Sequence, residues 1–85
     1  MNYPPHVWAQ IKNITTDELI AALLKDGFTF DNKLRTERIY LHPDGRRTAI
    51  HYHIGSKTFP KGLLKRILET AGWSVDDMRR LKLVK

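Results

Sequence analysis

The stretch from Thr36 to His53 reads TERIYLHPDGRRTAIHYH and has turn-forming residues at its centre. Pro43-Asp44-Gly45-Arg46 is typical of a tight turn, because an Asp-Gly pair favours the two-residue loops that join β-hairpins. The flanking segments contain Thr, Ile and Tyr, and β-branched and aromatic residues favour strands. The sequence therefore predicts an antiparallel hairpin with strands over Thr36–His42 and Arg47–His53.

A two-residue loop also fixes the register of this hairpin. It pairs residue 41 with 48, 39 with 50 and 37 with 52. This register places the apolar residues Ile39, Leu41 and Ile50 on one face. The opposite face is basic and aromatic, with Arg38, Tyr40, His42, Arg47, Ala49 and His51. We therefore expect helices to cover the apolar face and leave the basic face open.

Further elements are predicted upstream of the hairpin. Thr15 and Glu18 form a capping box ahead of an apolar helical stripe, which ends at Gly27. Apolar and polar residues alternate over Phe28–Phe30, which predicts a short strand, and a polar turn is predicted over Asn32–Arg35.

Downstream, a second helical stripe opens at Thr58–Pro60 and ends at Gly72. A short helix follows from Ser74. The order of helix, three antiparallel strands, helix and short helix predicts an α+β fold in two layers. With 85 residues the chain has room for one domain, which we place at residues 15–85 behind an N-terminal arm of residues 1–14.

The charge is the first indication of function. The chain has a formal net charge of +6, and residues 32–85 hold thirteen of the basic residues against five acidic ones. Such a basic surface attracts polyanions, nucleic acid above all, although it also serves solubility. There is no cysteine, which excludes disulfides and thiol chemistry. No apolar run approaches the ~20 residues that span a bilayer, so we expect a cytoplasmic protein without membrane contact.

Several segments together resemble the HicA (YcfA-like) toxins over roughly residues 15–80. They are Thr16-Asp17-Glu18-Leu19-Ile20, Lys25-Asp26-Gly27-Phe28, Arg38 to Arg46, Tyr52-His53 with Lys57, Pro60-Lys61-Gly62-Leu63-Leu64, and Ala71-Gly72-Trp73. The resemblance implies an α-β-β-β-α fold like that of double-stranded-RNA-binding domains. It also implies an mRNA interferase, a metal-independent endoribonuclease, that a HicB-like antitoxin protein holds inactive.

One position departs from the family pattern. The family has Gly-Ser-His directly before the strand that begins Arg38-Ile39-Tyr40 here, and that His is regarded as catalytic. This chain has Arg35-Thr36-Glu37 instead. The resemblance therefore places Glu37 where the family has its catalytic His.

We expect neither a metal nor a cofactor here. RNA cleavage without them needs a base for the 2′-hydroxyl, an acid for the leaving 5′-oxygen and cations that bind the phosphate. A glutamate, with an ordinary pKa near ~4.3, can act as base. In one hypothesis Glu37 acts as the base and His51 or His53 as the acid. The predicted register opposes this pairing, because it puts Glu37 on the helix-covered face and the two histidines on the other face. In the other hypothesis Glu37 is a rim carboxylate paired with a lysine or an arginine.

RNA-binding residues are predicted in two groups. Arg38, Tyr40 and Arg47 share the predicted basic face, where cations meet phosphates and an aromatic ring stacks. Lys57, Lys61 and Lys65 lie around the start of the second long helix, where backbone N–H groups also favour an anion. Trp8 and Trp73 we interpret as packing residues.

Three functions remain open. The first is a HicA-like toxin component that binds and cleaves mRNA. The second is an RNA-binding domain that has lost the catalytic histidine and does not cleave. The third is a basic interaction module for an acidic, antitoxin-like partner.

Overall fold

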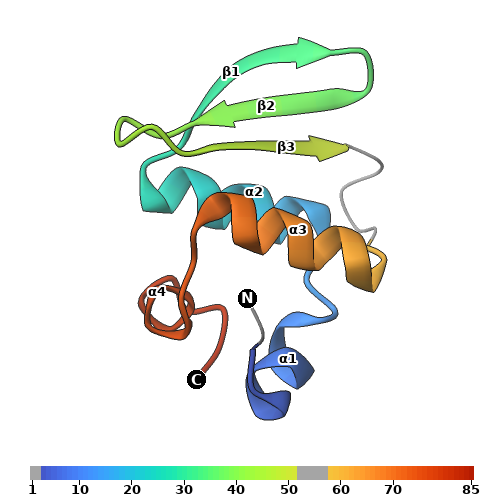
Figure 1. Cartoon of the computed structure of the whole chain (residues 1–85), viewed down its shortest axis with the longest axis vertical. Helices are drawn as coiled ribbons and strands as arrows, with labels where there is room; N and C mark the ends of the chain where they lie inside the picture. Colours follow the sequence, from blue (N-terminus) through green and yellow to red (C-terminus); the bar gives the residue numbers. More distant parts are fainter. Residues whose placement is uncertain (1–2, 52–57) are drawn as a thin grey trace.

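The computed structural model describes residues 3–51 and 58–85 (Figure 1). Its elements in chain order are α1 (Pro5–Ile11), α2 (Thr16–Asp26), β1 (Thr29–Leu34), β2 (Glu37–Leu41), β3 (Arg47–His51), α3 (Lys61–Ala71) and α4 (Val75–Arg80). The strands form one antiparallel sheet in the order β1-β2-β3. The predicted α+β class is confirmed, and so is the order of elements from α2 onwards; α1 is an additional helix within residues 1–14, which were predicted as an arm.

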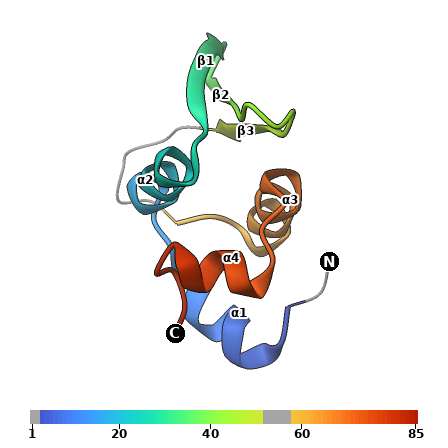
Figure 2. The ribbon, with the colours of Figure 1, turned by 90° about the vertical axis from the view of Figure 1, so that its left-hand side faces the viewer.

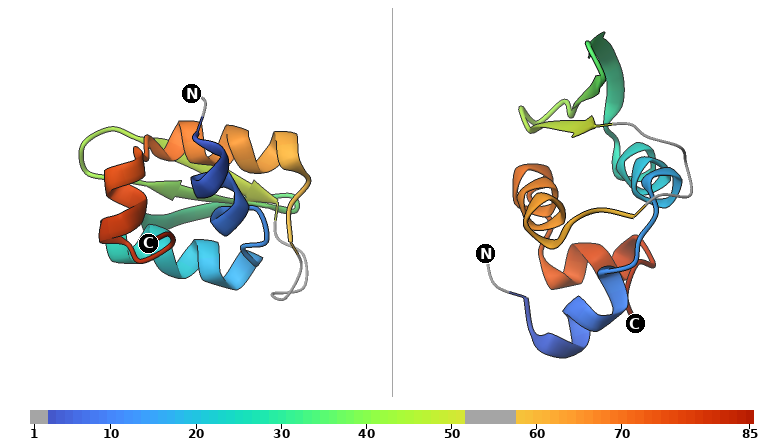
Figure 3. Two further views of the ribbon diagram at one scale, coloured as in Figure 1. Left: turned by 90° about the horizontal axis from the view of Figure 1, so that it is seen from below. Right: turned by 90° about the vertical axis from the view of Figure 1, so that its right-hand side faces the viewer.

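The helices lie to one side of the sheet (Figure 2). The strand β3 packs against α3, whereas β1 stands away from the helices and is exposed along its whole length. The helices α1 and α4 lie on the far side of α2 and α3 from the sheet (Figure 3). The molecule therefore has the two predicted layers and a further pair of short helices beneath them.

The helix α2 begins and ends where the sequence predicts. The backbone N–H of Glu18 donates to the hydroxyl of Thr15 at 3.2 Å, and the Thr15 N–H donates to the Glu18 carboxylate at 3.0 Å. Gly27 then ends the helix with φ +107°, a left-handed conformation in which a side chain is strained. A Cβ at Gly27 would also lie 2.9 Å from Nε2 of His42. Gly27 is thus required both for its backbone and for space.

The helices α3 and α4 follow the predicted pattern with one shift. Pro60 is the N-cap of α3 rather than part of its first turn, and Gly72 ends the helix with φ +73°. The helix α4 begins with a second capping box, in which Ser74 and Asp77 exchange hydrogen bonds. Among the residues that the structure describes, no helix is long and apolar enough to cross a membrane.

The hydrophobic core draws on α1 as well as on the later elements. Val7 and Ile11 of α1 are buried in the same cluster as Leu23 of α2, Ile50 of β3 and Leu68 of α3. Trp73 is fully buried there too, which confirms its interpretation as a packing residue. The N-terminal segment therefore contributes buried side chains to the core.

The first strand is longer than predicted. The alternation at Phe28–Phe30 indicated only a short strand, yet β1 runs on to Leu34 through residues predicted as a turn. The turn consists of Arg35 and Thr36, and Arg35 has φ +57°. Because β1 is held by its hydrogen bonds to β2 and not by burial, its sequence carries no apolar alternation.

Candidate functional site

The β2–β3 hairpin has a three-residue loop, not the predicted two-residue loop. The His42 N–H donates to the Arg46 carbonyl at 2.9 Å, so Pro43, Asp44 and Gly45 form the loop. Only Gly45 has a positive φ there, +100°. This arrangement is a type I turn followed by a left-handed glycine, in which Pro43 occupies the position that proline favours. The predicted register is therefore wrong by one residue.

The corrected register changes which side chains share a face. It pairs Glu37 with His51, Ile39 with Ala49 and Leu41 with Arg47. These six residues lie on one face of the hairpin, which we call the groove face. The other face, the core face, carries Arg38, Tyr40, Thr48 and Ile50, and Thr48 donates a hydrogen bond of 2.8 Å to Thr70 of α3.

Glu37 and His51 are thereby brought together. They are directly opposite each other at the end of the β2–β3 ladder, where opposed residues on one face have Cβ atoms about 5 Å apart. Glu37 is exposed and His51 is partly buried. The three-residue loop thus places Glu37 and His51 on one face, whereas the predicted two-residue loop put them on opposite faces.

A groove runs between the groove face and α3. Glu37, Arg47 and Ala49 line it from the sheet, and α3 completes it with Leu63, Arg66, Ile67 and Thr70; its volume is about 200 Å³. It therefore places one carboxylate, Glu37, with two guanidinium groups, those of Arg47 and Arg66. Neither arginine has an ion pair with a carboxylate in residues 3–51 and 58–85. A groove with two such cations and an adjacent imidazole suits a phosphodiester.

Two predicted RNA-contacting residues lie on the core face instead. The side chain of Tyr40 is 3% exposed and belongs to the hydrophobic core, so its ring is unavailable for stacking on a base. Arg38 lies across from Ile50 on the same face. Both were placed on the basic face by the two-residue loop, and both move because the side-chain period of a strand is two.

The remaining predicted residues fall in two places. Lys61 and Lys65 extend from α3 towards α1, and their ammonium groups lie 5.8 and 5.7 Å from the centre of the Trp8 ring. His53 and Lys57 lie outside the described residues. Within the described part of the chain, no three His, Asp or Glu side chains are close enough to hold a metal ion.

Part of the positive charge is neutralised within the fold. Asp26, at the end of α2, has a side chain that is 4% exposed and accepts hydrogen bonds from Arg46 at 3.2 Å, Arg80 at 2.6 Å and Nε1 of Trp73 at 2.9 Å. Arg46 also binds the carboxylate of Asp44 at 2.8 Å. These arginines tie the hairpin loop and α4 to α2, so they do not contribute to the charge of the groove.

The same contacts control the protonation of Asp26. Burial on its own would raise the pKa of this carboxyl group. The hydrogen bonds from Trp73 and Arg80 and the charges of Arg46 and Arg80 outweigh burial and hold the pKa below its ordinary value. Asp26 is therefore the ionised centre of a structural network.

Arg66 lines the groove but was not predicted as a site residue. Arg66 lies between the apolar positions of the α3 stripe, and the sequence does not show which side of the helix meets the sheet. Leu63, Arg66 and Thr70 follow the three- and four-residue spacing of one helix side, and this spacing was the available signal. The position of α3 along β3 decides which helix side lines the groove.

A comparison with known families matches the region that forms this site. The model for the HicA toxin of bacterial toxin–antitoxin systems matches residues 16–73. The match includes α2, the sheet and α3, and thus every residue of the groove; α1 and α4 lie outside it. A search of curated proteins finds no match. The chain therefore belongs to the HicA family of toxins of bacterial toxin–antitoxin systems.

Proposed function

We propose that this toxin is an mRNA endoribonuclease in which Glu37 and His51 form the acid–base pair. The observation that supports this most is the register of the β2–β3 ladder, which sets the two residues directly opposite each other. Glu37 also lines the groove that holds Arg47 and Arg66. A base, an acid and two phosphate-binding cations thus come from one small region.

The proposed reaction is transesterification within the RNA. The carboxylate of Glu37 accepts the proton of a 2′-hydroxyl, and the 2′-oxygen attacks the adjacent phosphorus. The imidazolium of His51 gives its proton to the 5′-oxygen as the P–O5′ bond breaks. The products are a 2′,3′-cyclic phosphate and a 5′-hydroxyl. Each proton-transfer group is worth about 10²–10⁴ in rate.

A carboxylate beside a phosphate carries an electrostatic cost. Two unit negative charges ~5 Å apart at an effective dielectric constant of ~20 repel by about 3 kcal/mol. Each arginine at a similar distance from the phosphate contributes an attraction of the same size. Arg47 and Arg66 therefore offset the repulsion that Glu37 introduces, and they stabilise the additional charge of the pentacoordinate intermediate.

The central test is cleavage of a long transcript by the purified protein in EDTA. We expect products with 5′-hydroxyl ends, and we expect Glu37→Gln and His51→Ala each to slow cleavage at least about 100-fold. Asp31→Asn is the matched control for Glu37, because Asp31 is an exposed carboxylate on β1. Equal cleavage by wild type and Glu37→Gln would contradict the role of Glu37.

Binding without cleavage is the outcome that favours the second function, a non-catalytic RNA-binding domain.

As a toxin of a toxin–antitoxin pair, the protein has a cognate antitoxin. We propose that this partner is HicB-like and acts by denying RNA access to the groove. Cleavage that persists in a saturated complex with such a protein would contradict this part of the proposal.

A further inference from the structure

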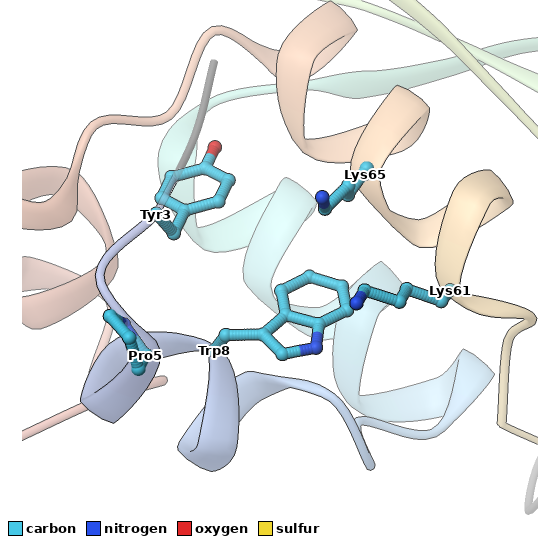
Figure 4. A pocket seen from close by; sticks show the side chains of 5 residues that line it. All are labelled: Tyr3, Pro5, Trp8, Lys61 and Lys65. Atoms are coloured by element: carbon cyan, nitrogen blue, oxygen red, sulfur yellow. The ribbon is translucent and has the colours of Figure 1, made fainter.

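A second cavity lies on the other side of α3, between this helix and the N-terminal segment. Tyr3, Pro5 and Trp8 line it from the N-terminal side, and Lys61 and Lys65 line it from α3; its volume is about 310 Å³ (Figure 4). We call it the aromatic–lysine cradle. Residues 3–8 precede the segment that matches the HicA family, residues 16–73, so the aromatic side of the cradle lies outside the matched segment.

Both aromatic walls are held in place. The Tyr3 hydroxyl donates a hydrogen bond of 2.8 Å to the backbone carbonyl of Trp73. Trp8 belongs to α1, whose Val7 and Ile11 are buried, and its ring packs partly against the core. In Figure 4 both rings come from the N-terminal segment and lie across from Lys61 and Lys65 of α3. Rings fixed in this way lose little conformational entropy when a flat ligand stacks on them.

The two lysines give the cradle its charge. They are four residues apart and so share one side of α3, and both ammonium groups lie within 6 Å of the centre of the Trp8 ring, at 5.8 and 5.7 Å. Neither lysine forms an ion pair with a carboxylate in the part of the chain that the structure describes. An anion at the mouth of the cradle would contact both.

From these features we propose that the cradle binds one unstacked nucleotide of single-stranded RNA, with its base on the aromatic rings and its phosphate between Lys61 and Lys65. Proteins that hold single strands combine these two elements, a stacking ring and a cationic track for the backbone. A base within a duplex does not expose its faces, so the cradle selects single-stranded RNA. An acidic peptide would meet the lysines but would leave both rings unused.

The position of the cradle extends the proposed function, on which this inference rests. Lys61 and Lys65 lie on one side of α3, and Arg66 lies on the side that lines the groove. The distance across a helix with its side chains is about 10–12 Å. One RNA strand can therefore cross the helix from the groove to the cradle, so that the cradle positions the strand at a site away from the cut.

The test is equilibrium binding of a fluorescein-labelled deoxyuridine decamer, which lacks the 2′-hydroxyl and is not cleaved. We expect Lys61→Gln/Lys65→Gln to weaken binding about tenfold and to lower the slope of log K against log salt by about 0.7, the value for the one phosphate that the two lysines hold. The control Lys25→Gln/Lys33→Gln removes the same charge from α2 and β1, and we expect it to change affinity less than about twofold.

Stacking can be followed by tryptophan fluorescence. The chain has only two tryptophans, and because Trp73 is fully buried, a ligand that stacks on a tryptophan can reach only Trp8. We expect the decamer to quench the fluorescence of Trp8, and Trp8→Leu to weaken binding about tenfold. Trp8→Phe keeps a ring and should retain most of the affinity, and thermal melts verify that each variant is folded. Absence of quenching, or equal affinities of the two double-lysine variants, would overturn the assignment.

Two further measurements, competition by hexaglutamate and transcript cleavage, distinguish RNA binding at the cradle from the alternatives. Hexaglutamate that displaces the decamer and binds in a Lys61- and Lys65-dependent way without quenching would identify an acidic protein segment as the occupant instead. Transcript cleavage is measured with the same proteins. Decamer binding that depends on the cradle, in a wild type that does not cleave RNA, would refute the proposed function alone. Cleavage that depends on Glu37, with cradle variants binding normally, would refute the cradle alone.

Discussion

Replacement of Asp26 tests the network that joins the hairpin loop, α2 and α4. Asp26→Ala leaves the buried Nε1–H of Trp73 without its acceptor at 2.9 Å, which costs about 1–3 kcal/mol. It also breaks two ion pairs, to Arg46 and Arg80, whose side chains are 28% and 53% exposed. Pairs that are exposed to this degree contribute at most about 1 kcal/mol each. We expect a total loss of about 2–4 kcal/mol in the free energy of unfolding.

Thermal and urea unfolding, followed by circular dichroism, measure this loss. In a domain of this size each 1 kcal/mol corresponds to about 4–8 °C in Tm, so Asp26→Ala should lower Tm by about 8–32 °C. The control is Asp76→Ala, because Asp76 is 93% exposed and its ion pair with Arg79 spans one helical turn; we expect it to cost less than about 0.5 kcal/mol. Equal losses in the two variants would refute the structural role of Asp26.

The same network has a defined pH dependence. Since folding lowers the pKa of Asp26, the carboxylate stabilises the fold fully above its unfolded-state pKa, and this contribution is lost as the pH falls through the folded-state pKa. Asp26→Asn cannot ionise. The difference in unfolding free energy between wild type and Asp26→Asn should therefore shrink as the pH falls below about 4. A difference that stays constant down to pH 2 would contradict the lowered pKa.

Three further substitutions test other contacts. Gly27→Ala should destabilise the fold by about 1–3 kcal/mol, because it combines a positive φ with a Cβ only 2.9 Å from Nε2 of His42; His42→Ala in the same chain should recover part of the loss in a urea titration. Thr48→Val should cost about 1–3 kcal/mol by removing the hydrogen bond to Thr70, and an unchanged midpoint of unfolding would refute this. Arg66→Gln should slow transcript cleavage about tenfold or more while Tm stays within a few degrees, because Arg66 is exposed in the groove.

The limits of α2 could be predicted because their signals are local. Thr15 and Glu18 satisfy each other within one turn, and Gly27 adopts a backbone conformation that few other residues tolerate. The start of α4 depends in the same way on Ser74 and Asp77. In each case the residues that decide the helix boundary lie within a few positions of one another in the sequence, so the boundary does not depend on contacts with distant segments.

The register of the hairpin could not be predicted as securely, because Asp-Gly fits loops of two and of three residues. Pro43 decides between them. Its fixed φ suits the first central position of a type I turn, which makes Gly45 the left-handed residue and leaves Asp44 with an ordinary backbone. The candidate site depends on this detail, since one residue of register moved Tyr40 into the core and brought Glu37 beside His51.

The helix α1 lies within residues 1–14, which were predicted only as an arm. Pro4 and Pro5 disfavour a helix interior, but here they precede and begin the helix, where a missing N–H costs nothing. Trp8 was correctly expected to pack on the domain. Its contact with Lys61 and Lys65 joins residues more than fifty positions apart, and no local pattern in the sequence indicates such a pairing.

The loop between β2 and β3 has a consequence for how this chain tolerates insertions and deletions. Surface loops usually accept a change of one residue at little cost. Removing one residue here would shift β3 by one residue and so exchange its two faces. Thr48 and Ile50 would then point towards the groove, and Arg47 and His51 would point towards the hydrophobic core. Adding two residues would leave every side chain on its present face. The parity of the change, more than its size, should decide whether a variant of this hairpin still functions.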